Sequence, residues 1–189
     1  MHKGSFGKME VFKEKYLDEN EDLLIIELGS LFYNGSCSSI FNSKNWKYNG
    51  VDVKDGEGVD ILVKDYYDMS SKIMGGTVSV VLSGQLLERV PKFWMVFSEV
   101  SRILEPGGLF CLVSASSGSY GSEGDFYRFS RDGLIELCDM SGLQMVECIT
   151  DNIGMWLDNY LVARKPAPVK PRKISRPAKK SEEPADAED

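Results

Sequence analysis

The stretch Leu23-Leu-Ile-Ile-Glu-Leu-Gly-Ser30 decides the fold of this chain, together with the later stretch Tyr48-Asn-Gly-Val-Asp52. Each is a short run that ends in an acidic residue, and a glycine follows the first acid closely. In an open α/β sheet, ligands bind in the crevice outside the carboxyl ends of the strands. The two stretches therefore predict a phosphate-free, nucleoside-sized ligand at the ends of two neighbouring strands.

Apolar patterning continues this arrangement along the chain. Apolar runs predict strands over residues 23–28, 48–53, 59–63, 78–83, 109–114, 145–150 and 159–163. Helical spacing and turn residues predict a helix over 5–18, a short helix or turn over 36–41, a helix that begins near Pro91, and a helix over 132–141. Strands that alternate with helices indicate a mainly parallel sheet with right-handed crossovers. The last two strands are expected to form an antiparallel hairpin.

The expected domain ends near residue 164. From Lys165 to Asp189 the chain is rich in Pro, Lys, Ala and Glu and has almost no apolar content. Such a segment cannot bury enough surface to fold, so we expect residues 1–164 to form one domain and residues 165–189 a disordered tail.

Charge and composition exclude several function classes. The net charge is −7, and the tail is basic, which leaves an acidic body and makes a broad nucleic-acid surface unlikely. The single histidine, His2, argues against a Ser-His-Asp triad and a multi-histidine metal site, so no metal is expected. The four cysteines show no CxxC pairing and are expected to be buried free thiols. Neither a membrane span nor a signal peptide is evident, which favours a cytoplasmic protein.

Three strand ends carry the candidate binding residues. Gly29, Asp52 and Asp65 lie at the tips of three consecutive expected strands, all on the same edge of the sheet. Each has a structural alternative, namely an ordinary turn or a solvated cap. Together they provide what a nucleoside needs: close backbone approach at a glycine, a carboxylate for ribose hydroxyls and a polar group for the adenine edge.

With these residues in place, the chain resembles the class I S-adenosylmethionine-dependent methyltransferases of the compact, general methyltransferase-domain type. The resemblance spans roughly residues 5–164. It rests on Glu27-Leu-Gly-Ser30, Asn34-Gly-Ser36, Gly50-Val-Asp52, Gly58-Val-Asp60, Asp65-Tyr-Tyr-Asp-Met69, Leu82-Ser-Gly-Gln-Leu-Leu-Glu88, Val100-Ser-Arg-Ile-Leu-Glu-Pro-Gly-Gly108 and Asp125-Phe-Tyr-Arg-Phe129. It implies a Rossmann-like three-layer α/β/α fold with a mainly parallel seven-stranded sheet and S-adenosyl-L-methionine as cofactor.

The resemblance also assigns roles by position. Glu27, Gly29 and Ser30 would form the loop beneath the methionine portion, and Asp52 beside Val53 would hold the ribose hydroxyls. Asp65 and the backbone at Tyr66 would meet the adenine amino edge. Ser83, Gly84 and Gln85 would line the methionine and methyl-transfer side.

The chain departs from the family pattern at four positions. Leu31 and Tyr33 stand where glycines are usual, Ser79 stands near an expected acid, and Arg89 replaces a frequent histidine. These departures keep an alternative open, a catalytically inactive protein of the same fold that serves as a binding or assembly module. A nicotinamide-dependent oxidoreductase is disfavoured because no G-x-G-x-x-G opens the first crossover.

The acceptor side offers two candidate catalytic acids, Asp125 and Glu88, with Glu123 as a further candidate. A hydroxyl acceptor would need a general base. The structural alternatives are an ion pair of Asp125 with Arg128 and a helix-start role for Glu88. Four aromatic residues are expected either to pack in the core or loops or to form a platform on which a sugar stacks: Phe126, Tyr127, Phe129 and Trp156. We expect a small-molecule or glycan-type acceptor; the sequence does not indicate an oligomeric state.

Overall fold

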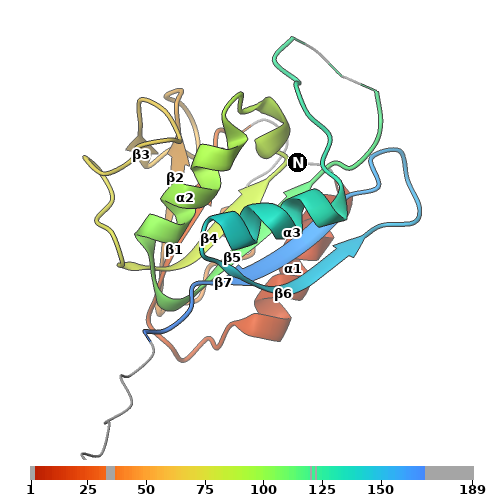
Figure 1. Cartoon of the computed structure of the whole chain (residues 1–189). Coiled ribbons are helices and arrows are strands. Elements are labelled where there is room, and N and C mark those ends of the chain that lie inside the picture. The colour runs from red at the N-terminus through yellow and green to blue at the C-terminus, as the bar shows by residue number, and fades with distance from the viewer. Residues whose placement is uncertain (1–2, 33–36, 120, 122, 169–189) are drawn as a thin grey trace, which may run out of the picture.

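The computed structural model describes residues 3–32, 37–119, 121 and 123–168. Its centre is a seven-stranded sheet with the order β3-β2-β1-β4-β5-β7-β6 (Figure 1). The strands are β1 (Leu23–Leu28), β2 (Trp46–Asp52), β3 (Ile61–Leu62), β4 (Val78–Gly84), β5 (Leu104–Ser114), β6 (Gln144–Thr150) and β7 (Asn159–Arg164). β7 lies antiparallel between β5 and β6, and the other pairs are parallel. The mainly parallel sheet and the antiparallel C-terminal hairpin are thus confirmed.

Helices cover both faces of the sheet and complete three layers. The α-helices are α1 (Lys3–Tyr16), α2 (Phe93–Ile103) and α3 (Arg131–Met140), and the short 3-10 helices are η1 (Cys37–Ser39) and η2 (Leu87–Arg89). In Figure 1, α2 and α3 lie in front of the sheet and α1 lies behind it. α1 buries Met9 and Phe12 on its own face, whereas Phe97 of α2 and Leu134 of α3 belong to the core on the other.

The central strand explains why the sheet is buried on both sides. From Val78 to Ser83, every residue of β4 is buried, and Val80 and Leu82 face one core while Val81 faces the other. A strand covered on both faces reads as a continuous apolar run, which is the pattern that predicted it.

The half of the sheet formed by β1, β2 and β3 is connected mainly by loops. The expected strand over 59–63 is reduced to Ile61–Leu62, and the described part of the expected segment 36–41, residues 37–41, contains the 3-10 helix η1. The loop that precedes β3 packs instead against the end of β1, where Phe32 N–H donates to the carbonyl of Glu57 (3.0 Å). This leaves the carboxyl ends of β1 and β2 open to a cavity.

Lys165, the first residue of the expected tail, still pairs with β5. Its N–H donates to the carbonyl of Gly108, and its carbonyl accepts from the N–H of Gly107 (2.9 and 2.8 Å). Residues 169–189 of that tail lie outside the described residues. Within the described part of the chain, the four cysteines are buried and free, as expected, and every helix is too short or too polar to span a bilayer.

Candidate active site

A cavity of about 710 Å³ opens at the carboxyl ends of β1, β2 and β4. Its size lies within the range of small-molecule sites. The residues that line it are Glu27, Gly29, Ser30, Leu31, Asp52, Val53, Lys54, Tyr66, Gly84, Gln85, Leu86, Arg89, Val90, Glu123 and Gly124. Eight of the ten expected cofactor residues are brought together here, and Asp65 and Ser83 are not among the lining residues.

Asp52 ends β2 and is fixed by backbone donors on both sides. Its Oδ2 accepts from the N–H of Leu31 (3.1 Å), and its Oδ1 accepts from the N–H of Lys54 (3.0 Å). Each carboxylate oxygen has a second lone pair for a ligand hydroxyl. Only 7% of Asp52 is exposed, so hydrogen bonds made there meet little competition from water.

Glu27 lies in β1, next to Asp52 in the order of the sheet. The hydroxyl of Tyr48, on β2, donates to Glu27 Oε2. Burial raises the pKa of the Glu27 carboxyl, and the hydrogen bonds from Tyr48 and Cys37 offset part of that rise. Glu27 therefore offers an oriented acidic group at the centre of the cavity wall.

Glycines allow the loops of this wall to meet closely. A Cβ on Gly50 would lie 2.0 Å from the carbonyl oxygen of Gly58 and 2.6 Å from Ser30 Oγ. Gly29 has φ +77°, a conformation that favours glycine. Ser30 is 4% exposed, and its Oγ has no hydrogen-bond partner among the described residues. A buried hydroxyl without a partner at a cavity wall is a place for a ligand or water.

Gln85 lies directly after β4 in a left-handed backbone conformation, with φ 55°. Its backbone N–H donates to the carbonyl of Val113 (2.8 Å), which anchors the turn to β5. Non-glycine residues with positive φ are uncommon and cluster at functional sites. Gly84 and Gln85 line the cavity, whereas the buried Ser83 has a hydroxyl without a partner among the described residues and lies outside the lining.

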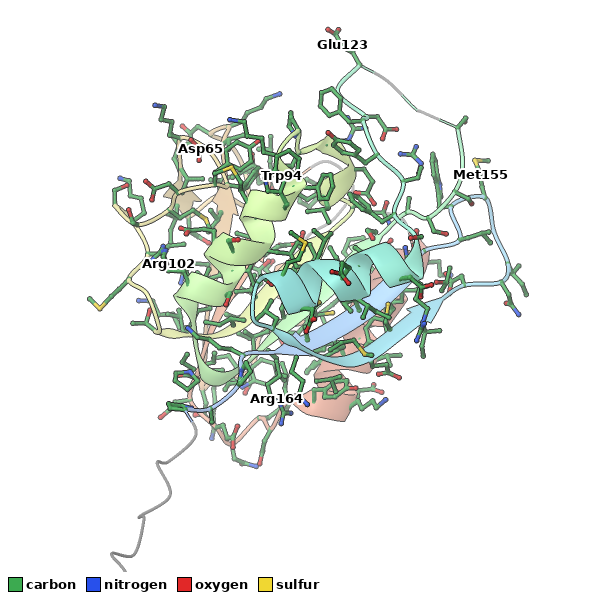
Figure 2. All side chains as sticks on the ribbon, viewed as in Figure 1. Asp65, Trp94, Arg102, Glu123, Met155 and Arg164 are labelled. Carbon is green, nitrogen blue, oxygen red and sulfur yellow. The ribbon has the colours of Figure 1, made fainter. Side chains whose placement is uncertain are left out.

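Asp65 and Tyr66 separate in the structure. Asp65 Oδ1 accepts from the N–H groups of Tyr67 and Asp68 (2.9 and 3.0 Å) and so caps its own turn. Figure 2 places it among the loops around β2 and β3. Tyr66 is 6% exposed and lines the cavity. The wall at this end is therefore formed by Tyr66, and the Asp65 carboxylate serves the local turn.

The departures from the family pattern have local explanations. Leu31 lines the cavity, and its Cδ1 lies against Gly56, 2.5 Å from where a Cβ on that glycine would be. Ser79 Oγ accepts from the N–H of Leu24 (3.3 Å) at the opposite end of the sheet. Arg89 lines the cavity from η2. Tyr33 lies outside the described residues.

Glu88 is buried behind the cavity and is not one of its lining residues. Its Oε1 accepts from the N–H of Ala115, while Oε2 has no partner among the described residues. Burial raises the pKa of this carboxyl to about 7. Its own carbonyl also accepts from the N–H groups of Phe126 and Tyr127 (2.8 and 3.2 Å). These bonds tie η2 to the loop that follows β5.

Asp125 forms the ion pair that was its structural alternative. Arg128 donates to both of its oxygens (Nη1–Oδ1 2.6 Å, Nη2–Oδ2 2.9 Å), and the N–H of Gly121 adds a third bond (2.8 Å). The guanidinium lowers the pKa of Asp125 to about 2. Because so weak a base takes up a proton poorly at neutral pH, and Asp125 is absent from the cavity lining, this geometry disfavours it as a general base.

The aromatic residues near Asp125 pack mainly against one another. Tyr127 and Phe129 lie edge-on to Phe93 of α2, with ring centroids 4.8 and 5.0 Å apart. Trp156 lies under the guanidinium of Arg128 (5.3 Å). Packing therefore accounts for three of the four aromatics; Phe126 alone is 48% exposed.

Sequence reasoning missed several lining residues, namely Lys54, Leu86, Val90 and Gly124. It also missed Ser5 of α1, which joins Gln85 and Asp158 in a buried hydrogen-bond network. Lys54 and Leu86 directly follow the expected cofactor residues Val53 and Gln85, so their position in the sequence could have indicated them. Nothing in the sequence pairs Ser5 with Asp158, because the contact joins opposite ends of the domain.

Comparison with known proteins supports the fold. No protein-family model matches the sequence, and no curated protein matches it either. Among solved structures, the chain resembles a Burkholderia thailandensis 1,6-didemethyltoxoflavin N1-methyltransferase with bound S-adenosylhomocysteine (TM-score 0.67, 14% identity, 86% of this chain and 78% of that one). It also resembles the CurJ carbon methyltransferase (TM-score 0.63, 18% identity, 82% of this chain) and spans about half, 51%, of that protein.

A third neighbour has a different printed activity. The cyclase SpnF matches with a TM-score of 0.66 and 13% identity, over 86% of this chain and 81% of that one. The chain therefore has the Rossmann-like fold of class I S-adenosylmethionine-dependent methyltransferases. A shared fold does not by itself assign a reaction.

Proposed function

We propose that the chain is an S-adenosylmethionine-dependent methyltransferase that acts on a small-molecule or glycan-type acceptor. The observation that carries this proposal is the placement of Asp52, Glu27 and Gln85 along one cavity, at the ends of three adjacent strands. The sheet order β2-β1-β4 sets the order of these three side chains. The cofactor would lie across Asp52 and Glu27, with its methyl group directed toward Gln85.

Asp52 would hold the ribose. Its two oxygens are oriented by the N–H groups of Leu31 and Lys54, and a pair of adjacent hydroxyls can donate to one carboxylate. Val53 and Tyr66 would flank the adenine beyond it. Glu27 and the Gly29 turn would face the methionine portion, where an acidic group can accept from the ammonium.

The sulfonium methyl group would then lie at the β4 end, near Gln85 and Leu86. Methyl transfer is an in-line displacement in which the cofactor supplies the electrophile. The chain would contribute orientation and exclusion of water, which can account for much of the rate. The wall at this end is completed by Arg89, Val90 and Gly124, which would contact the acceptor.

Calorimetric titration with S-adenosylhomocysteine and S-adenosylmethionine tests the cofactor half of the proposal. We expect one site, with affinity reduced roughly 100-fold by Asp52→Ala, about 2.7 kcal/mol, because charge-assisted hydrogen bonds to ribose are lost. Absence of heat with both compounds, or equal affinity of the wild type and Asp52→Ala, would exclude this site as the cofactor site.

Turnover is tested separately, by following formation of S-adenosylhomocysteine in the presence of candidate acceptors. We expect formation only when an acceptor is added. A chain that binds the cofactor and methylates nothing across amines, alcohols, sugars and carboxylic acids would instead be a binding module of the same fold.

A further inference from the structure

Gln85 is the polar side chain at the reacting end of the cavity whose orientation is fixed by buried partners. Its Nε2 donates to Asp158 Oδ1 (3.0 Å) and to Ser5 Oγ (3.2 Å). Ser5 in turn donates its only hydroxyl proton to Asp158 Oδ2 (3.2 Å). Asp158 and Ser5 are 1% and 0% exposed, so solvent does not compete for these bonds.

Proton counting fixes which way the amide lies. A carboxylate can only accept hydrogen bonds, so the amide nitrogen and not the oxygen must face Asp158. Both Nε2 protons are then used by Asp158 and Ser5. Among the described residues no hydrogen bond reaches Oε1 of Gln85, and Gln85 is one of the residues that line the cavity. The network therefore presents an amide oxygen, a pure acceptor, at the end of β4.

The acidic residues that line the cavity are not placed to remove a proton from an acceptor beside Gln85. Glu27 is hydrogen-bonded by Tyr48 on the β2 side, and both oxygens of Asp52 hold backbone N–H groups. Glu123 stands at the tip of the loop between β5 and α3, with its side chain directed away from the body of the molecule (Figure 2). Among the described residues that line the cavity, an alcohol, which must lose its proton as it attacks, finds no carboxylate oriented toward this end.

From this geometry we infer that the methyl acceptor is a neutral amine N–H group, whose hydrogen is held by Gln85 Oε1. This inference rests on the proposed function. The nitrogen lone pair attacks the methyl carbon while the C–S bond breaks and its electron pair returns to sulfur, giving the thioether product. The nitrogen becomes cationic, and its proton passes to water after transfer. An amide oxygen suffices for this step, because it orients the donor and stabilises the charge that develops on it.

Asp158 and Ser5 act as positioning residues in this scheme. Asp158→Asn tests them, because an asparagine amide can donate to Gln85 and so permit the Gln85 amide to turn over and present N–H to the cavity. We expect kcat/KM for the N–H acceptor to fall at least tenfold, while affinity for S-adenosylhomocysteine stays within threefold. Gln85→Leu, which removes the oxygen and leaves the Ser5–Asp158 pair in place, should give the same result if Asp158→Asn does not fold.

The matched control is Asp132→Asn, the same acid-to-amide change at a 90% exposed side chain of α3, and it should leave every value unchanged. The acceptors are aniline, phenol and benzoic acid, with benzylamine, benzyl alcohol and phenylacetic acid as a second matched set. Turnover of each is measured as formation of S-adenosylhomocysteine. Turnover confined to the amines, and lost in Asp158→Asn or Gln85→Leu, supports the inference.

Three results would overturn it. Turnover of the alcohols or acids in place of the amines excludes an N–H acceptor, and so does cofactor binding with no turnover of either amine. Equal losses of S-adenosylhomocysteine affinity and of turnover in Asp158→Asn would place Gln85 on the cofactor and not on the acceptor. Failure of the wild type to bind S-adenosylhomocysteine is a separate outcome, because it removes the proposed function itself.

Discussion

Asp52 and Asp125 both lie at the carboxyl edge of the sheet, but in regions that hold acids differently. Asp52 belongs to the cavity over β1, β2 and β4, and among the described residues its hydrogen-bond donors are the backbone N–H groups of Leu31 and Lys54. Asp125 belongs to the loop pair, the described residues of 115–129 together with 151–158, which follows β5 and precedes β7. There a guanidinium takes both carboxylate oxygens. A carboxylate held by two backbone N–H groups has lone pairs left for a ligand, whereas in the bidentate ion pair both oxygens of Asp125 are taken by Arg128.

The loop pair is held together by many side-chain to backbone bonds. Ser116 Oγ donates to the carbonyl of Leu157 and Ser117 Oγ to that of Met155, while Arg128 donates to the carbonyls of Ser117 and Ser119. Figure 2 shows Met155 at the outer bend of one loop and Glu123 at the tip of the other. The loop pair is thus bonded mainly within itself, while Glu123 and Gly124 line the cavity and η2 connects the two regions.

Glu88, the connecting residue, gives the first prediction. Its pKa is raised to about 7 from an ordinary value of 4.5, so its contribution to stability is complete below pH 4.5 and is lost as the pH rises through 7. Glu88→Gln keeps an oxygen for the Ala115 N–H and cannot ionise. The difference in unfolding free energy between variant and wild type should therefore shift in favour of the variant between pH 4 and pH 8. The shift should be on the order of 3 kcal/mol, at about 1.36 kcal/mol per pKa unit. Urea unfolding at both pH values measures this gain; a constant difference would refute the buried, protonated state.

A matched pair of variants tests the contrast between the two aspartates. Asp52→Asn should weaken S-adenosylhomocysteine binding roughly 100-fold, about 2.7 kcal/mol, because a charge facing the ligand is removed. Asp125→Asn should change that affinity less than about threefold, since its charge is directed to Arg128. Calorimetry measures both. Equal losses would show that the loop pair is part of the cofactor site.

Two glycines, one beside the cavity and one in the loop pair, test whether packing defects in the two regions affect ligand binding differently. Gly50→Ala places a Cβ 2.0 Å from the Gly58 carbonyl oxygen, and Gly118→Ala places one 2.5 Å from Trp156 Cε3. Each should cost about 2 kcal/mol of unfolding free energy through overpacking. Only Gly50→Ala should also reduce ligand affinity, because its neighbour Ser30 lines the cavity.

Gly7→Ala in α1 is the control, since nothing lies within 4 Å of its added Cβ, and it should stabilise by about 0.5–1 kcal/mol. Denaturation and calorimetry on the three variants separate the outcomes. A loss of ligand affinity in Gly118→Ala as large as that in Gly50→Ala would contradict the separation of the two regions.

Arg128→Lys should have the smallest effect, about 1 kcal/mol and local to the loop pair. A lysine keeps the charge but cannot make the bidentate bond to Asp125 or lie as a plane over Trp156. Hydrogen exchange should increase over residues 115–129 and 151–158 and stay unchanged in β1 and β2. Faster exchange throughout the sheet would mean that Arg128 stabilises the whole domain.

Much of the site could be predicted because it depends on strand ends. Glu27, Gly29 and Asp52 follow directly from apolar runs that end in an acid, and parallel strands bring such ends to one edge. Asp65 could not be placed in the same way, since a side chain just past a strand can serve a ligand or its own turn. Asp125 was likewise ambiguous until its distance from Arg128 was known. Whether these residues act on a cofactor stays a prediction.

The sequence by itself determined the order of strands and helices, the mainly parallel sheet and the closing hairpin, because periodicity and turn residues are local properties. Only the tertiary structure decided that Glu27 and Asp52 line the cavity while Asp125 is held in an ion pair with Arg128. It also decided that Ser5 and Asp158, from the two ends of the domain, orient Gln85. Hydrogen-bond partners distant in sequence leave no periodic signal, so their pairing emerges only when the layers pack.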